Sequence, residues 1–451
     1  MTRKPHTRKP KKVHHVAPAD TGSTATANTA APAVEPMGST PVDHPVFGQP
    51  QPTADPKKFE TKHPSDGAAY KQIDALNRQH KLEALPFPAP RGLPEPRLTL
   101  AAALGVDEAA LQKQIAANGK LVFHSTGDTG STRGPESQNL VADKMVSDFT
   151  DDDPDKPSFL FHLGDVIYSF GEPQYYYDQF YEPYRDYPAP IVAIAGNHDG
   201  MVAPGTNATS LAAFLDNFCA TEFEVAPEAG GLSRTAQVQP GVFFTFEAPF
   251  VRILALYSNT LEDPGVIADK TIGDSQIAYL KAALARVKSE GFKGALLIAH
   301  HHPAYTAGSM HGWSLNMLSQ IDAECDAAGV WPHAVLSGHA HNYQRFTRAH
   351  GEAQIPYFIC GNGGHGLAKL QTKKDTNTPL RTPKLLDGPA KSDKVTLENY
   401  DDEDYGYLRV IVTAKQLRIE YHPASDGAGA KTPDDSVTVD LATRKLVQFT
   451  G

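Results

Sequence analysis

The chain has 451 residues, of which 40% are hydrophobic and 21% charged, and its formal net charge at pH 7 is −10. Six Lys or Arg and no acid fall within residues 1–15, so the remaining 436 residues carry a net charge of −16. A chain of this length can bury a large core, which predicts one large domain with accessory segments. The acidic body argues against nucleic acid as the main partner.

Cysteine usage and the N-terminal sequence bear on the compartment. Cys219, Cys325 and Cys360 are too widely spaced to indicate a disulfide framework or a structural zinc site, and free thiols suit a reduced compartment. No apolar segment follows the basic N-terminus, and no run is long enough to span a bilayer. We therefore expect no membrane span and a cytoplasmic or non-classically exported protein, while the oligomeric state is open.

Two accessory segments precede the main body. Residues 1–65 are rich in Pro, Ala and Thr and poor in large apolar side chains, which predicts a disordered basic arm. Residues 66–118 are predicted to be a helical extension, because "AAYKQIDALNRQHKLEAL" and "DEAALQKQIAAN" have helical periodicity. Gly119 is placed to end the second helix. Whether this extension forms a lid, an interface or a packing shell is open.

The third segment, residues 119–451, changes to short apolar runs of the kind found in strands that are buried on both faces. Helical stretches such as "DSQIAYLKAALARVKSEG" lie between several of them, which predicts an α/β domain. The predicted strands are "KLVFHSTGD", "SFLFHLGD", "PIVAIAGN", "VRILALYSN", "GALLIAHHH" and "HAVLSGHAH".

Five of these six runs end in side chains that can bind a metal. The ends are Asp128, Asp165, Asn197 with His198, His300 to His302, and His339 with His341. Open α/β sheets bind ligands at the carboxyl ends of their strands, and carboxylate, amide and imidazole groups suit transition metals. A lone Gly-Asp after a strand is commonly only a turn, but five successive ends of this kind favour a metal site. Two metals in one site need a bridging carboxylate, which one of the two aspartates would provide.

The order GD, GD, GNHD, HHP, GHxH resembles the calcineurin-like metallophosphoesterases over about residues 120–365. Most of that superfamily begins with D-x-H, whereas this chain has Asp128-Thr129-Gly130 and carries Tyr168 three residues after Asp165. "GDTG" and "GDVIY" resemble the purple acid phosphatase branch, in which the tyrosine phenolate replaces that histidine as a ligand. The resemblance implies a four-layer α/β/β/α sandwich with two mixed sheets and a domain spanning 119–451.

The resemblance also implies a ligand set for two metal ions. For the first metal, Fe(III), the implied ligands are Asp128, Tyr168 and His341. For the second metal, Fe(II), Zn or Mn, the implied ligands are Asn197, His301 and His339, with Asp165 bridging the pair. The H-x-P register selects His301 from the three consecutive histidines, and His302 could orient it through a hydrogen bond.

Two histidines are implied to act on the substrate. His198 would contact the phosphate and help to protonate the leaving oxygen, and His311 resembles a substrate-facing histidine, although a surface position is equally compatible with the sequence. His365, in "GNGGH", is expected to be structural or peripheral.

The expected function is hydrolysis of phosphate monoesters by a metal-bound hydroxide at a dinuclear centre. Two alternatives stay open. The same ligands could hold Mn or Zn in a phosphodiesterase, or the chain could be a non-catalytic protein that recognises a phosphorylated partner through its N-terminal arm.

Overall fold

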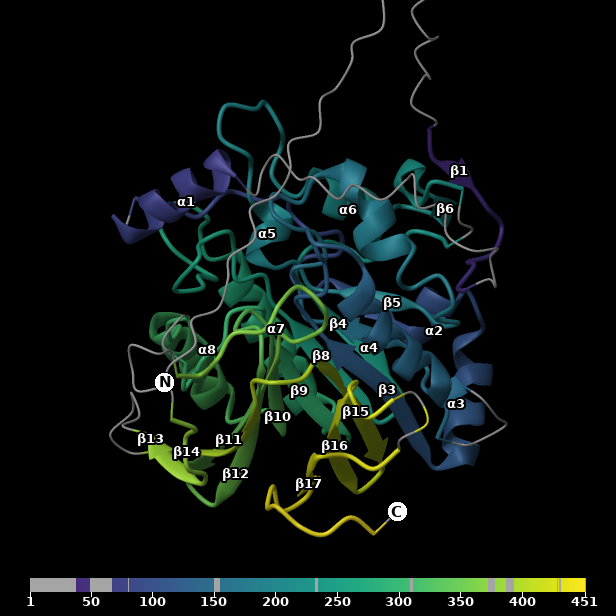
Figure 1. Cartoon of the computed structure of the whole chain (residues 1–451). Coiled ribbons are helices and arrows are strands. Elements are labelled where there is room, and N and C mark those ends of the chain that lie inside the picture. The colour runs from purple at the N-terminus through teal and green to yellow at the C-terminus, as the bar shows by residue number, and fades with distance from the viewer. Residues whose placement is uncertain are drawn as a thin grey trace, which may run out of the picture. The chain divides into compact units, whose positions relative to one another are not determined.

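The computed structural model describes residues 38–48, 67–79, 81–149, 155–231, 234–308, 311–371, 378–386, 393–427, 429 and 431–450. The chain divides into two compact units, Met1–Met37 and Gly38–Gly451, and the first lies outside the described residues. Within the second unit, helices and strands are interspersed from Lys120 to Ser337, as the apolar runs predict, and the described residues from Tyr343 onward contain strands and no helix (Figure 1).

Two large mixed sheets form the centre of the second unit. The nine-stranded sheet has the order β13 (Lys384–Leu386), β14 (Lys394–Asp401), β11 (Tyr343–His350), β12 (Ala353–Cys360), β10 (Ala334–Ser337), β9 (Ala295–Ala299), β8 (Val251–Ala255), β7 (Phe244–Ala248), β2 (Arg97–Thr99). The six-stranded sheet has the order β17 (Asp435–Asp440), β16 (Gln416–Pro423), β15 (Gly406–Thr413), β3 (Lys120–Thr126), β4 (Leu160–His162), β5 (Ile191–Ala193). Each of the six predicted strands is present.

Parallel pairing sets the geometry of the site. Strands β3, β4 and β5 run parallel, with Ser125 opposite Phe161 and Phe161 opposite Val192. Strands β8, β9, β10 and β12 also run parallel to one another. The carboxyl ends of each parallel group therefore meet at one edge of its sheet.

The inner faces of the two sheets share one hydrophobic core. Phe123, Phe161, Phe246, Leu297 and Val410 belong to it, and all five are fully buried. Alternate residues of the same strands point outward, which is why these strands read as continuous apolar runs.

Helices cover the outer faces. Helices α7 (Ser275–Ser289) and α8 (Leu315–Ala328) pack on the nine-stranded sheet, where Leu280 and Met317 share a core with Leu296 and Ile298. Helix α4 (Glu136–Val146) packs on the six-stranded sheet. The predicted four-layer α/β/β/α sandwich is confirmed (Figure 1).

Short elements connect the layers. They are η3 (Ser147–Phe149), η4 (Pro173–Tyr175), η5 (Tyr177–Tyr181), α5 (Asn197–Gly200), α6 (Ala212–Phe218) and η6 (Pro227–Ala229). A two-stranded sheet joins β1 (Thr40–Pro41) to β6 (Glu224–Val225).

The segment predicted to be a helical extension contains α1 (Ala68–Arg78), α2 (Leu100–Leu104) and α3 (Glu108–Asn118). Helix α3 matches its prediction, beginning at an Asp107 cap and ending at Gly119 in the left-handed conformation. Helix α1 is shorter than predicted. Asn259 exchanges two hydrogen bonds with the backbone of Leu85, of 2.7 and 2.8 Å, and these hold the chain in a non-helical conformation there.

The same segment contributes a strand that the sequence did not predict. Strand β2 pairs in parallel with β7 at the edge of the nine-stranded sheet, with Leu98 opposite Phe246. The domain boundary at residues 118 and 119 stays a prediction.

Most of the predicted arm, residues 1–37 and 49–65, lies outside the described residues. Residues 38–48 fall within that arm, and they contact the body of the second unit. The Val42 N–H donates to the Phe223 carbonyl at 2.9 Å, and the Thr235 N–H donates to the Val46 carbonyl at 3.1 Å.

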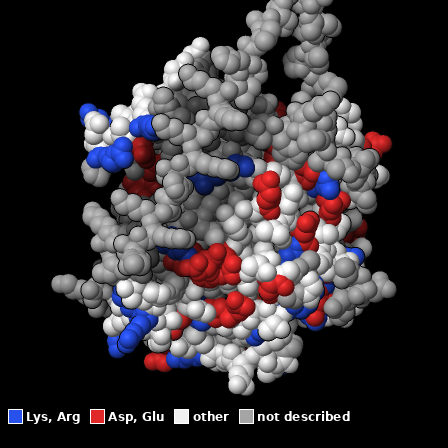
Figure 2. All heavy atoms as spheres, viewed as in Figure 1, with Lys and Arg blue, Asp and Glu red and all other residues white. Residues whose placement is uncertain are grey.

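The three cysteines, Cys219, Cys325 and Cys360, are buried and form no disulfide. Across the part of the chain that the structure describes, no helix combines the length and the apolar character needed to cross a bilayer. Figure 2 shows Asp and Glu side chains gathered over the middle of one face, with Lys and Arg side chains scattered among and around them.

Candidate metal centre

The seven predicted ligands meet at the carboxyl edge of the two sheets. They come from the turns that follow β3, β4, β5, β9 and β10, and six of the seven are at most 2% exposed. Four of them, Asp128, Asp165, His339 and His341, have positive φ angles of 55°, 53°, 69° and 27°. Non-glycine residues rarely adopt such angles, and they cluster at functional sites.

The first group surrounds the Tyr168 hydroxyl. Its Oη donates to Asp165 Oδ2 at 2.9 Å and lies 3.1 Å from both Asp128 Oδ1 and His341 Nε2. His341 Nε2 is also 3.4 Å from Asp128 Oδ1. Asp128, Tyr168 and His341 are the residues predicted to hold the first metal.

The second group surrounds the amide oxygen of Asn197. This oxygen lies 3.1 Å from His301 Nε2 and 3.2 Å from His339 Nδ1. His301 Nδ1 donates to the Leu163 carbonyl at 2.8 Å, so in the neutral ring the lone pair of Nε2 faces the centre. A backbone hydrogen bond of this kind fixes the ring of a metal-binding histidine.

Asp165 touches both groups. Its Oδ2 lies 2.9 Å from Tyr168 Oη and 3.1 Å from His301 Nε2, and its Oδ1 accepts from the His198 N–H at 2.9 Å. This is the position that a bridging carboxylate would need.

The electrostatics of the centre favour a cation. Burial raises the pKa of Asp165, but the neighbouring imidazoles, led by His301, lower it more, and the carboxyl titrates well below its ordinary value. Burial lowers the pKa of His301, while Asp165 and Asp128 raise it to about 10. Burial and the same two carboxylates raise the pKa of Tyr168. Buried carboxylates that hold a proton on His301 would equally attract a metal ion.

The donor set fits two metal ions. It offers carboxylate, amide and phenol oxygens with imidazole nitrogens, and the amide nitrogen of Asn197 has no hydrogen-bond partner among the described residues while its oxygen faces the centre. Ligand atoms of Asp165, His301 and His339 lie within 4.8 Å of one another. Such a mixture suits Fe, Zn or Mn.

Two glycines lie where any side chain would collide with neighbouring atoms of the centre. A Cβ on Gly196 would lie 2.1 Å from Asp165 Oδ1, so a side chain there would displace the Asp165 carboxylate. Gly130 stands where D-x-H would place its histidine, and a Cβ there would lie 2.4 Å from the Val166 carbonyl oxygen. The chain therefore has no room for a side chain at 130, and Tyr168 reaches the centre instead.

The two predicted substrate histidines lie beside the ligands. His198 is 6% exposed, and its Nδ1 donates to the Ser169 carbonyl at 2.8 Å. The ring centroid of His311 lies 4.4 Å from that of His339 and 5.5 Å from that of His341. Burial lowers the pKa of His311 well below its ordinary value, and His339 and His341 add to this effect.

His302 differs from its expectation. It does not hydrogen-bond to His301, because its Nδ1 pairs with Ser258 Oγ at 2.8 Å and its Nε2 donates to the Leu261 carbonyl at 2.7 Å. It holds the loop after β8 instead.

That loop supplies acids which the sequence analysis missed. Asp263 lies 3.8 Å from His311 Nδ1 and 3.5 Å from His339 Nε2, and Glu262 accepts from the Tyr70 hydroxyl at 3.0 Å. "SNTLED" follows a predicted strand, and this was the available signal.

Two further residues support the centre. His365 is not peripheral, because its ring stacks on Tyr168 with centroids 3.5 Å apart and its Nδ1 donates to the Gly130 carbonyl at 2.7 Å. Asp199 accepts N–H groups from Gly196 at 2.8 Å and Val166 at 3.0 Å, and so ties two ligand turns together. Burial and the nearby Asp165 raise the Asp199 pKa to about 7.

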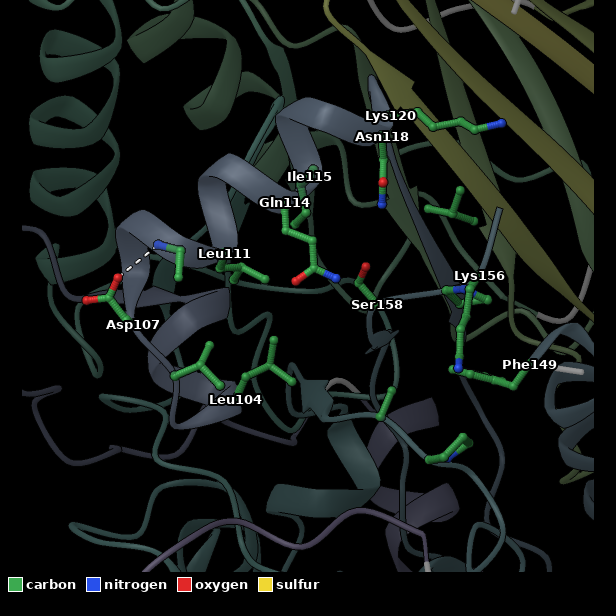
Figure 3. A pocket seen from close by; sticks show the side chains of 16 residues that line it. Leu104, Asp107, Leu111, Gln114, Ile115, Asn118, Lys120, Phe149, Lys156 and Ser158 are labelled. Carbon is green, nitrogen blue, oxygen red and sulfur yellow. Dashed lines mark hydrogen bonds between the residues drawn. The ribbon is translucent and has the colours of Figure 1, made fainter. Parts of the chain in front are cut away.

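A separate cavity of about 870 Å³ lies between α3 and the β3 side of the six-stranded sheet (Figure 3). Leu111, Gln114, Lys120 and Lys156 line it, and none of the nine predicted site residues does.

Comparisons with known proteins match part of the chain to one family. Residues 123–343 match the family model of the calcineurin-like phosphoesterases. A comparison with curated protein sequences finds no match.

Solved structures give weaker similarities. A purple acid phosphatase from yellow lupin (Lupinus luteus) seeds is 18% identical, with a TM-score of 0.47 over 71% of this chain, which spans 54% of the lupin chain. PhoD is 14% identical, with a TM-score of 0.41 over 74% of this chain and 72% of its own. A predicted phosphoesterase from Streptococcus pneumoniae is 10% identical, with a TM-score of 0.27 over 71% of this chain and 98% of its own. TM-scores below 0.5 carry no argument about function.

Proposed function

We propose that this chain is a metal-dependent phosphoric ester hydrolase, because residues 123–343 match the family model of the calcineurin-like phosphoesterases. The carboxylate, amide and imidazole groups at the sheet edge support this reaction class, because they can hold cations next to a bound phosphate.

We further propose that it is a phosphomonoesterase of the purple acid phosphatase type with Fe(III) beside Tyr168. One observation carries this assignment: the Tyr168 hydroxyl contacts Asp128, Asp165 and His341, while Gly130 leaves no room for the histidine of D-x-H. The second site, formed by Asn197, His301 and His339, would take Fe(II), Zn or Mn.

Metal ions bound at these residues would neutralise the charge of the phosphate and lower the pKa of the attacking water. Asp165 would fix the spacing of the two sites. His198 would donate a proton to the leaving oxygen through Nε2, because its Nδ1 is already held by Ser169. Burial lowers the pKa of His198, but Asp165 and Glu262 raise it above its ordinary value.

His311 would face the substrate beside His339 and His341. Its acid partner Asp263, at 3.8 Å, would orient the ring.

The test compares an aryl phosphate monoester with its diester, using protein loaded with iron or with manganese and Asp165→Asn as the blank. We expect turnover of the monoester by the iron-loaded protein, and a loss of at least about 100-fold in the blank, because the pair of sites loses its bridge. Turnover of the diester alone would indicate a phosphodiesterase at the same ligands. No turnover of either would favour a non-catalytic protein that recognises phosphate.

A further inference from the structure

Helix α1, which precedes the phosphoesterase domain, packs directly on the segments that carry His198. Ile73 on this helix shares a small apolar cluster with Phe170 and Met201. Phe170 follows the Ser169 carbonyl that holds the imidazole of His198, and Met201 follows the short helix α5 to which His198 belongs. The helix therefore contacts the chain on both sides of the proposed proton donor.

Tyr70 brings a second tyrosine ring to that histidine. The imidazole of His198 contacts two tyrosine rings: Tyr168, with centroids 4.2 Å apart and an angle of 39°, and Tyr70, with centroids 5.6 Å apart and an angle of 32°. Tyr168 is one of the predicted ligands, whereas Tyr70 belongs to α1.

The Tyr70 ring is itself held in place by an acid. Its hydroxyl donates at 3.0 Å to Glu262, which is 8% exposed and stands on the loop after β8. Burial raises the pKa of Glu262 above its ordinary value, although His198 and the hydrogen bond from Tyr70 oppose this shift.

We infer that Tyr70 and Glu262 are positioning residues that hold the imidazole of His198 at the leaving-group side of the substrate. This inference rests on the proposed function. It gives the N-terminal helix a part in the reaction: a tyrosine outside the phosphoesterase domain completes the setting of the proton donor. Displacement of a catalytic group by about 1 Å can cost on the order of 100-fold in rate, so small changes here should be measurable.

Substrates whose leaving groups differ in basicity can distinguish a residue that positions the proton donor from one that only supports the structure. An alkyl phosphate needs a proton at its leaving oxygen, whereas p-nitrophenyl phosphate has a leaving group that departs without one. In the intact chain, Tyr70→Phe and Glu262→Gln should each lower kcat for an alkyl phosphate by about 10-fold and for p-nitrophenyl phosphate by about twofold or less, with KM unchanged. Gln72→Ala, on the exposed side of α1, is the control and should change neither.

Equal losses for both substrates, or a rise in KM alone, would overturn the positioning role. A second measurement does not depend on activity: the ring proton signals of His198 in zinc-loaded protein, assigned with His198→Gln, should move in Tyr70→Phe and stay in Gln72→Ala. If the wild-type protein hydrolyses no ester, the proposed function fails, and the histidine signals then decide whether Tyr70 sets this ring. Signals that do not move would overturn the inference as well.

Discussion

At the scale of single residues, the feature that distinguishes this centre is a phenol placed among carboxylates. Tyr168 is 1% exposed, and burial together with Asp128 and Asp165 raises the pKa of its hydroxyl. Without a cation the group is therefore a neutral donor. A trivalent cation would reverse that preference, because it stabilises the phenolate far more than the two carboxylates oppose it.

Tyr168→Phe tests this reversal. We expect iron-loaded wild-type protein to absorb visible light through the Tyr168 phenolate and the variant to lose that band, which an absorption spectrum would record. Tyr70→Phe is a matched control, because it also removes one hydroxyl from a tyrosine that flanks His198 but leaves the ligands in place. A band of equal strength in Tyr168→Phe would contradict the proposed iron ligand.

The site residues that the sequence predicted differ physically from those it missed. Asp128 and Asp165 follow buried apolar strands directly, and parallel pairing brings such strand ends together, so their proximity follows from the chain order. Glu262 and Tyr70 lie on a loop and on the partly buried side of a helix, and their meeting depends on how α1 packs. Local sequence carries no record of that packing.

At the scale of elements, the antiparallel pair β15 and β16 contains a cluster of charges around Glu420. Arg418 Nε donates to Glu420 Oε1 at 2.6 Å, His422 Nε2 lies 3.3 Å from Oε2, and Arg409 donates to Oε2 at 3.4 Å. Burial raises the pKa of this carboxyl, but the hydrogen bonds from His422 and Arg418 lower it more, from 4.5 to about 2.

A depressed carboxyl pKa stabilises the folded state above the pKa of the unfolded chain, and this contribution is lost as the pH falls from 4.5 to about 2. In metal-free protein, Glu420→Gln should therefore lower the free energy of unfolding at pH 7 by about 1 to 2 kcal/mol, a figure already reduced for solvent screening. The difference in the free energy of unfolding between this variant and the wild type should be smaller at pH 3 than at pH 7. Urea midpoints at pH 7, 5 and 3 would measure it.

Glu352→Gln is the control for that experiment, because Glu352 pairs with Lys445 at 2.8 Å while its side chain is 95% exposed. Exposed ion pairs contribute little, so this variant should match wild type at every pH. A Glu420→Gln protein with unchanged midpoints would show that the cluster does not stabilise the sheet.

Elements also differ in how well the sequence predicted them. Helix α3 has an Asp107 cap and a Gly119 stop, and both signals are local. Strand β2 has three residues and no such signal, and it forms because β7 presents a free edge with which Leu98 can pair. Helix α1 ends at Arg78, and beyond it Asn259, far along the chain, binds the backbone of Leu85 in a non-helical segment. Both differences thus involve long-range partners.

At the scale of the whole molecule, the two units differ in net charge. Residues 1–37 contain six Lys or Arg and two acids, so the rest of the chain carries a net charge of −14. Among the described residues, the contacts of the candidate centre come from residues between Tyr70 and His365. A hydrolase built on that centre would not need the basic segment, whereas a protein that recognises a phosphorylated partner through its arm would.

Two truncations distinguish these roles. Removal of residues 1–37 should leave kcat/KM for a small phosphate monoester within about twofold and should not change Tm, as expected if catalysis and stability rest on the contacts of the described residues. Removal of residues 1–48 also takes away β1 and the Val42 and Val46 backbone hydrogen bonds, of 2.9 and 3.1 Å, and should lower Tm by a few degrees. Kinetics and thermal melts on both proteins provide the measurement. A loss of hydrolysis on removing residues 1–37 alone would mean that the basic segment takes part in catalysis, and that the centre described above is incomplete without it.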